Sequence, residues 1–172
     1  MHPTLAVSLP TLPTLPRATA RSRPTGLLVG TEVMTDEGAL PVEFLLAGDR
    51  ILTRNGPVEL RGTSVLQAID AEVVVIEPAA QIPGRAGAAL VLPVSQQVLV
   101  RDWRAQILHG TEHMLTPASS LVDDLLVRRE SRDTLRLIRL HFDAPQVFWA
   151  GGLEVASART RAPVALPERW LH

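Results

Sequence analysis

The sequence predicts an all-β fold, and three observations support this prediction. Short stretches in which apolar and polar residues alternate recur through the middle of the chain. Glycine, proline and asparagine separate these stretches, as expected for turns between short strands. Segments with helical periodicity are few. The chain has 172 residues, of which 46% are hydrophobic, so it is large enough to bury one core.

The first predicted strands lie in the N-terminal third of the chain. Glu32–Thr35 is short and is followed by Asp36-Glu37-Gly38, a turn signal. Arg50–Arg54 alternates in polarity and leads into Asn55-Gly56, the strongest two-residue signal for a β-hairpin. Because Val58–Leu66 also alternates, we expect it to form one strand that pairs antiparallel with Arg50–Arg54.

The later predicted strands are more apolar. Val73–Ile76 is a continuous β-branched run, typical of a strand that is buried on both faces, and Pro78 closes it. Ala88–Leu92 and Gln97–Arg101 follow, and Pro93 indicates a turn or a sheet edge between them. The remaining expected strands are Leu135–Phe142 and Val147–Ala150, the second of which ends at the bend Gly151-Gly152.

Only two short helical turns are expected. Glu43–Leu46 is one, and Pro117–Val122 is the other, with Thr116 as its cap and Pro117 in the first helical position. The stretch Arg128–Asp133 alternates in the sign of its charges, which favours a solvated loop with local ion pairs over a nucleic-acid surface.

Composition excludes several classes of function. The formal net charge of −1 provides no field that would attract nucleic acid or anionic lipid. No apolar run approaches the ~18 residues needed to span a bilayer. The absence of cysteine removes disulfides, thiol nucleophiles and cysteine-ligated zinc. No secretory signal is recognisable, so a cytoplasmic location is the default expectation, and no cofactor is expected.

Three segments are expected along the chain. Residues 1–25 are rich in proline and threonine and are predicted to form an extended or disordered arm. Residues 26–158 form the folded domain. Residues 159–172 are predicted to be an irregular tail.

Three blocks of sequence, in this order and at this spacing, resemble a bacterial Hint domain, the fold shared by inteins and the autoprocessing part of Hedgehog proteins. The blocks are Gly26–Thr35 with Pro41–Leu45 and Ala47–Thr53, then Leu90–Val100, then Leu137–Asp143 with Val147–Val155. The resemblance implies a flattened horseshoe of short antiparallel strands with an approximate internal two-fold. It also implies self-processing at a peptide bond that lies in a cleft near the first domain residue.

The residues that would carry this chemistry are replaced. Hint domains use a thiol or hydroxyl at the first domain residue to attack the preceding carbonyl, and this position is Gly26 here. A histidine that protonates the departing nitrogen is replaced by Gln96, and a second frequent histidine by Pro145. The resemblance therefore predicts a catalytically silent Hint domain that acts as a binding or structural module. Self-cleavage through Thr25, one residue earlier, is the alternative.

The resemblance also predicts which residues line the former active-site cleft and what it holds. The expected lining residues are Gly26, Thr31, Ser95, Gln96, His141 and Asp143. A peptide or protein segment is the expected occupant, and the N-terminal arm is one candidate for it.

Two histidine patterns allow other interpretations. His109 and His113, with Glu112 between them, could hold a metal ion, although two surface histidines in a loop are the simpler interpretation. His141 and Asp143 share one face of a predicted strand, so the carboxylate could orient a catalytic base. A structural hydrogen bond is the simpler role for this pair, because no nucleophile accompanies them.

Overall fold

The computed structural model describes residues 23–81, 87–101, 106–107 and 110–158, and it confirms the all-β prediction. Its strands are β1 Leu27–Leu28, β2 Glu32–Thr35, β3 Gly38–Pro41, β4 Arg50–Thr53, β5 Gly56–Glu59, β6 Gly62–Ile76, β7 Leu90–Pro93, β8 Gln97–Arg101, β9 His113–Pro117, β10 Val127–His141, β11 Val147–Ala150 and β12 Leu153–Ala156. The short helical segments in this part of the chain are η1 Val42–Phe44, α1 Pro78–Gln81 and η2 Ala118–Leu121. None of them has the length and apolar character that a bilayer span requires.

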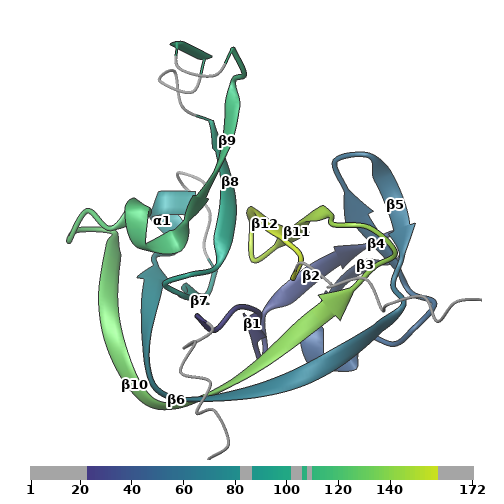
Figure 1. The fold of residues 1–172 in the computed structure, drawn as a ribbon, viewed down its shortest axis with the longest axis horizontal. Coiled ribbons are helices and arrows are strands. Elements are labelled where there is room, and N and C mark those ends of the chain that lie inside the picture. Colours follow the sequence, from purple (N-terminus) through teal and green to yellow (C-terminus); the bar gives the residue numbers. More distant parts are fainter. Residues whose placement is uncertain (1–22, 82–86, 102–105, 108–109, 159–172) are drawn as a thin grey trace, which may run out of the picture.

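The strands form a horseshoe whose base is the ribbon of β6 and β10 (Figure 1). These two strands have 15 residues each and pair antiparallel from Val127↔Ile76 to His141↔Gly62. The first sheet has the order β1-β10-β6-β7. The second has the order β3-β2-β4-β11-β12-β8-β9, with β5 paired to β4. Because the long ribbon spans the molecule, it brings the start of the domain and the turn before β8 to one place.

The core lies between the two sheets, with a smaller apolar cluster on the other face of the ribbon. The segment Val73–Ile76 of β6 contributes side chains to both clusters, and all four of its side chains are buried. Val74 and Ile76 belong to the main core, whereas Val73 and Val75 belong to the smaller cluster. The prediction of a strand buried on both faces is confirmed.

The hairpin predicted at Asn55-Gly56 is confirmed, but its second strand is shorter than expected. Thr53 pairs with Gly56, which has a φ of +94°. The prediction of one strand over Val58–Leu66 is wrong, because β5 ends at Glu59 and β6 begins at Gly62. Leu60 is fully buried between them, and its backbone hydrogen bonds go to Asp49 and Gly48. The burial of this one side chain turns the path of the strand.

The prediction of a solvated loop over Arg128–Asp133 is also wrong, because these residues form the first half of β10. Arg128–Glu130 pair with the buried valines Val73–Val75 of β6, which supply the apolar contacts that the charged stretch lacks. The expected local ion pairs do form, because Glu130 contacts both Arg128 and Arg132. A partner strand far along the sequence therefore outweighs the local polarity.

The remaining local predictions differ from the structure in detail. Pro93 is the last residue of β7 and a turn follows it, as expected, but the strand begins at Leu90 and excludes Ala88. The second helical turn is η2, and Thr116 does not cap it because that residue belongs to β9. The expected arm 1–25, except for its last three residues, and the tail 159–172 lie outside the described residues.

Candidate functional site

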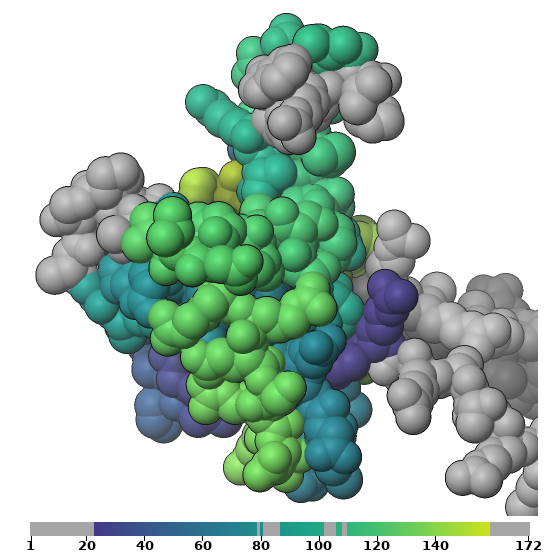
Figure 2. Space-filling model, turned by 90° about the vertical axis from the view of Figure 1, so that its left-hand side faces the viewer, coloured from purple at the N-terminus to yellow at the C-terminus, as the bar shows by residue number. Residues whose placement is uncertain are grey.

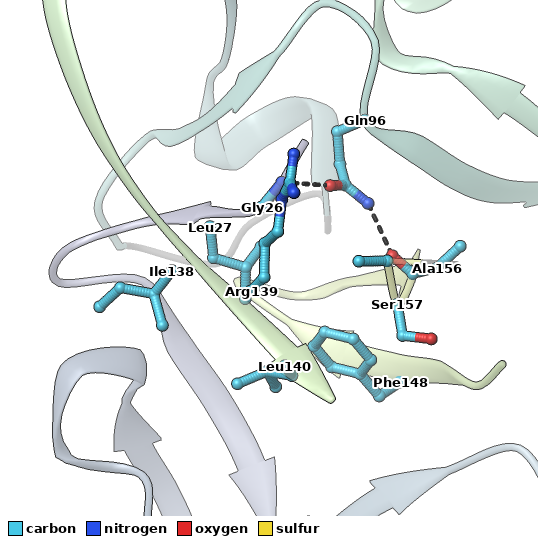
Figure 3. Close-up of a pocket in the computed structure, with 10 residues that line it drawn as sticks. Gly26, Leu27, Gln96, Ile138, Arg139, Leu140, Phe148, Ala156 and Ser157 are labelled. Carbon is cyan, nitrogen blue, oxygen red and sulfur yellow. Dashed lines mark hydrogen bonds between the residues drawn. The ribbon is translucent and has the colours of Figure 1, made fainter. Parts of the chain in front are cut away.

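Three side chains hold the chain segment that leads into β1, and Figure 3 shows two of them, Gln96 and Arg139, beside Gly26. The hydroxyl of Ser95 donates a hydrogen bond to the carbonyl of Pro24. The guanidinium Nε of Arg139 donates to the carbonyl of Thr25 over 3.0 Å. The backbone N–H of Gly26 donates to Oε1 of Gln96 over 2.9 Å. Each of these bonds reaches a backbone atom, so the site binds the main chain of the segment.

Gln96 connects the beginning and the end of the folded domain. Its side chain is almost fully buried, at 3% exposed, in the turn between β7 and β8. While Oε1 accepts from Gly26, Nε2 donates to the carbonyl of Ala156 over 2.8 Å and to that of Gln97 over 3.2 Å. A primary amide can accept and donate at once, which neither a carboxylate nor an apolar side chain can do.

Gly26 has a backbone conformation that other residues rarely adopt. Its φ is +134°, and a Cβ at this position would lie 3.0 Å from the carbonyl oxygen of Ile138. The same atom would lie 3.2 Å from Cβ of Leu137 and 3.3 Å from Cγ of Arg139. The Ile138 oxygen is part of the β10 backbone and Leu137 Cβ is attached to it. This part of β10 is paired with a strand on each side, β1 and β6. The close approach of β1 to β10 therefore selects glycine.

The space around this segment is small. The pocket beside it has a volume of about 10 Å³, near the size that one water molecule needs. It is lined by Gly26 and Gln96, by Ile138–Leu140 of β10, by Phe148, and by the residues that follow β12. The segment Pro24–Gly26 and its hydrogen-bond partners thus fill most of the site.

The structure brings three of the predicted lining residues together: Gly26, Ser95 and Gln96. Thr31, His141 and Asp143 make their hydrogen bonds elsewhere. The backbone of Thr31 bonds to the carbonyl of Leu28 and to the N–H of Val42. His141 bonds through Nε2 to the hydroxyl of Ser64 over 2.6 Å.

Asp143 lies beyond the end of β10 and pairs with Arg61, not with His141. Nε and Nη2 of Arg61 bond to the carboxylate, the closest approach being 2.7 Å, and these hydrogen bonds hold the pKa of Asp143 below its usual value. Both side chains are at least half exposed. Pro145 is exposed in the loop between β10 and β11. The predicted hydrogen bond between His141 and Asp143 is therefore wrong, because β10 ends at His141 and each side chain bonds to another residue.

The candidate metal pair is described only in part. His113 lies in β9, where its Nε2 is 3.1 Å from Nε of Arg101. Glu112 is exposed next to it, and His109 lies outside the described residues. Among the residues that are described, no group of three or more histidine, cysteine, aspartate or glutamate side chains could hold a metal ion. The His109–His113 pair stays a prediction.

Sequence analysis missed Arg139, because its pattern resembles that of an exposed arginine on a strand. Its partner, the carbonyl of Thr25, is 114 residues away and is a backbone atom. The only signal was an arginine within an otherwise apolar stretch, Leu137–Leu140, close to the predicted cleft.

We expect Gln96→Glu to lower the free energy of unfolding by about 1–3 kcal/mol, because a carboxylate would face the carbonyl of Ala156 without a proton to donate. Gln96→His can accept from Gly26 with one ring nitrogen and donate with the other, so its loss should be smaller. Urea unfolding of both variants checks this order. Equal stability of Gln96→Glu and wild type would contradict the role given to the amide.

Comparison with known proteins agrees with this geometry. The sequence profile of the Hint domain matches residues 25–162. The fold is similar to that of a bacterial intein-like domain from Clostridium thermocellum, at 15% identity and a TM-score of 0.53, over 78% of this chain and 99% of that one. It is also similar to a DnaB intein from Synechocystis sp. PCC 6803, at 11% identity and a TM-score of 0.52, over 78% of this chain and 99% of that one. No match is found among curated proteins. With its profile match covering most of the sequence, the chain belongs to the Hint domain family.

Proposed function

We propose that this chain is a catalytically silent Hint domain that serves as a binding or structural module. The observation that carries the proposal is the conformation of Gly26. Self-processing needs a nucleophile at this residue, and glycine has none. Its positive φ and the contacts that a Cβ would make with β10 also disfavour any residue that could supply one. Position 26 therefore lacks a nucleophilic side chain, and its backbone conformation disfavours residues that carry one.

Gln96 supports the same proposal from the other side of the peptide bond. Departure of the Gly26 nitrogen requires a group that gives it a proton. Here the side chain that contacts this nitrogen presents an oxygen, which accepts the N–H hydrogen bond. An amide also does not titrate near neutral pH, so it cannot act as general acid.

The arrangement suits a structural anchor for the segment that precedes the domain. The hydrogen bonds that Ser95, Gln96 and Arg139 make with Pro24, Thr25 and Gly26 all go to main-chain atoms of that segment. Such contacts tolerate many sequences before Gly26. An external peptide would have to displace this segment first, so we propose that the occupant of the cleft is the chain's own segment. Figure 2 shows this start of the described chain, in purple, leaving the body beside the ribbon.

Self-cleavage through Thr25 is the second candidate, and one observation favours it. Attack by the Thr25 hydroxyl would occur at the Pro24 carbonyl, and the hydroxyl of Ser95 donates a hydrogen bond to that oxygen, where negative charge would develop. The contact of Arg139 is with the next carbonyl, that of Thr25, and does not serve this reaction. The two histidines that the structure describes, His113 and His141, bond to other residues, so neither is placed to act as the base.

Intact mass spectrometry tests the proposal. We expect the purified full-length chain to keep its mass through days of incubation with hydroxylamine or dithiothreitol. A nucleophile-dependent fragment that begins at Gly26 or Thr25 would overturn it. Thr25→Ala is the control variant: a fragment that disappears in this variant assigns the reaction to the Thr25 hydroxyl, and one that persists assigns it to another group.

A further inference from the structure

One edge of the β6–β10 ribbon has no strand partner in the described part of the chain. β7 pairs with β6 only from Val73 to Ile76, and the N–H of Val94 bonds to the carbonyl of Glu72. From Gly62 to Ala71, β6 therefore pairs only with β10 on its other side. Figure 1 shows this half of β6 as the lower rim of the horseshoe.

The free edge lacks the features that usually protect edge strands. Lysine, other charges, proline and bulges normally keep such edges from pairing. The eight residues 62–69 contain no charged residue and no proline, and the first interruption is Asp70, whose φ is +49°. The side chains of Val65 and Ile69 are 58% and 72% exposed. They lie on one face of the strand, since residues four apart in a strand point the same way.

The opposite edge of the same ribbon provides a direct comparison. Over the ten residues 127–136, β10 carries six charged side chains, namely Arg128, Arg129, Glu130, Arg132, Asp133 and Arg136. β6 carries one, Asp70, over the ten residues 62–71. Both strands have similar exposure here, so solvent contact alone does not account for the difference. The β10 edge is protected against pairing, and the β6 edge is not.

We propose that this edge of β6 binds the same edge of a second copy of the chain, as an antiparallel pair centred on Gln67. A two-fold axis through Gln67 places Val65 opposite Ile69 of the second copy, and Ile69 opposite Val65. Leu66 faces Ala68 on the other side of the sheet. Apolar side chains meet apolar ones in both layers, and the two Gln67 amides meet on the axis, where each can donate to the other.

Charge favours the antiparallel arrangement over a parallel one. A parallel pair would place the two Asp70 carboxylates side by side, whereas the antiparallel pair separates them to opposite ends. There each Asp70 faces Ser64 of the other copy, whose hydroxyl can donate to the carboxylate while it accepts from the Nε2–H of His141. The assembly stops at two chains, because both copies use the same edge in the two-fold pair. It is independent of the cleft at Gly26 and of the function proposed for it.

The area involved sets the expected strength. Seven paired residues in each chain form a small interface compared with those of stable dimers, so we expect the dimer to dissociate on dilution. Sedimentation velocity should show a weight-average mass that rises with concentration from that of the monomer towards twice that value. Ile69→Lys should remain monomeric. Leu115→Lys, which places the same charge on an exposed residue of the edge strand β9, should associate like wild type.

Single cysteines test the register, because the natural chain contains none. Directly opposed residues of an antiparallel pair have Cβ atoms ~4.5–5.5 Å apart, close to the span of a disulfide. Under mild oxidation we expect Gln67→Cys to form a disulfide-linked dimer much faster than Leu115→Cys. Mixed Val65→Cys and Ile69→Cys chains should cross-link faster than either variant alone.

A wild-type chain that is monomeric at all concentrations, with Gln67→Cys no faster than Leu115→Cys, would overturn the proposal. A dimer that Ile69→Lys leaves intact would also overturn it. Equal self-linking of all three β6 variants would indicate a parallel pair and contradict the stated register. Circular dichroism of each variant confirms that the substitution leaves the domain folded.

Discussion

Gly26→Cys is expected to return the missing thiol without restoring self-cleavage, and to lower the free energy of unfolding by about 2–4 kcal/mol. Part of this loss comes from the φ of +134°, which a residue with a Cβ adopts only under strain. The other part comes from contact of that Cβ with the carbonyl oxygen of Ile138, 3.0 Å away, and with Cβ of Leu137. The intact mass after incubation with dithiothreitol measures self-cleavage, and urea unfolding measures the loss of stability.

Two other glycines provide matched controls for Gly26. Gly30 has a φ of +89°, and nothing lies within 4 Å of the Cβ position, so Gly30→Ala tests strain alone and should cost about 1–2 kcal/mol. Gly62 has neither a positive φ nor a close neighbour, so Gly62→Ala should change stability little. If Gly26→Cys is as stable as Gly62→Ala and yields a thiol-dependent fragment, then the cleft has lost only its nucleophile. The backbone argument for a silent domain would then be wrong.

Arg54→Met is expected to lower the free energy of unfolding by about 2–4 kcal/mol, because it leaves a buried carboxylate without its partner. Nε and Nη2 of Arg54 bond to the two oxygens of Glu154 over 2.7 and 3.0 Å. The Glu154 side chain is only 9% exposed, whereas that of Arg54 is 40% exposed, which places the expected loss below that of a fully buried pair. The pair connects the β4–β5 hairpin to β12.

Arg61→Met is the matched control for Arg54→Met. Arg61 makes a similar forked contact with Asp143, but the Asp143 side chain is 74% exposed, so loss of the Arg61 guanidinium should lower stability much less than loss of that of Arg54. In Arg54→Met/Glu154→Met no unpaired charge remains, and we expect it to recover part of the stability that the single variant loses. Urea unfolding that gives the same loss for Arg54→Met and Arg61→Met would show that burial of Glu154 has no such effect.

Local features of the fold could be predicted where the signal is a run of neighbouring residues. The hairpin at Asn55-Gly56 and the doubly buried strand Val73–Ile76 depend on turn chemistry and on side-chain type, which the sequence displays directly. Prediction failed at Leu60 and at Arg128–Asp133. In both places a contact with a distant segment determines the structure: burial of Leu60 in the core, and the pairing of the charged stretch with β6.

The sequence by itself determined that the chain has no cysteine, and its resemblance to Hint domains predicts that Gly26 and Gln96 stand at the positions of the nucleophile and the proton donor. Only the tertiary structure decided what these residues do instead. Gln96 joins Gly26 to Ala156, 70 and 60 residues away, and Arg139 reaches the Thr25 carbonyl across 114 residues. A periodic pattern reports which side of a strand is buried. It does not contain the partner of a hydrogen bond, because that partner depends on where the folded chain returns.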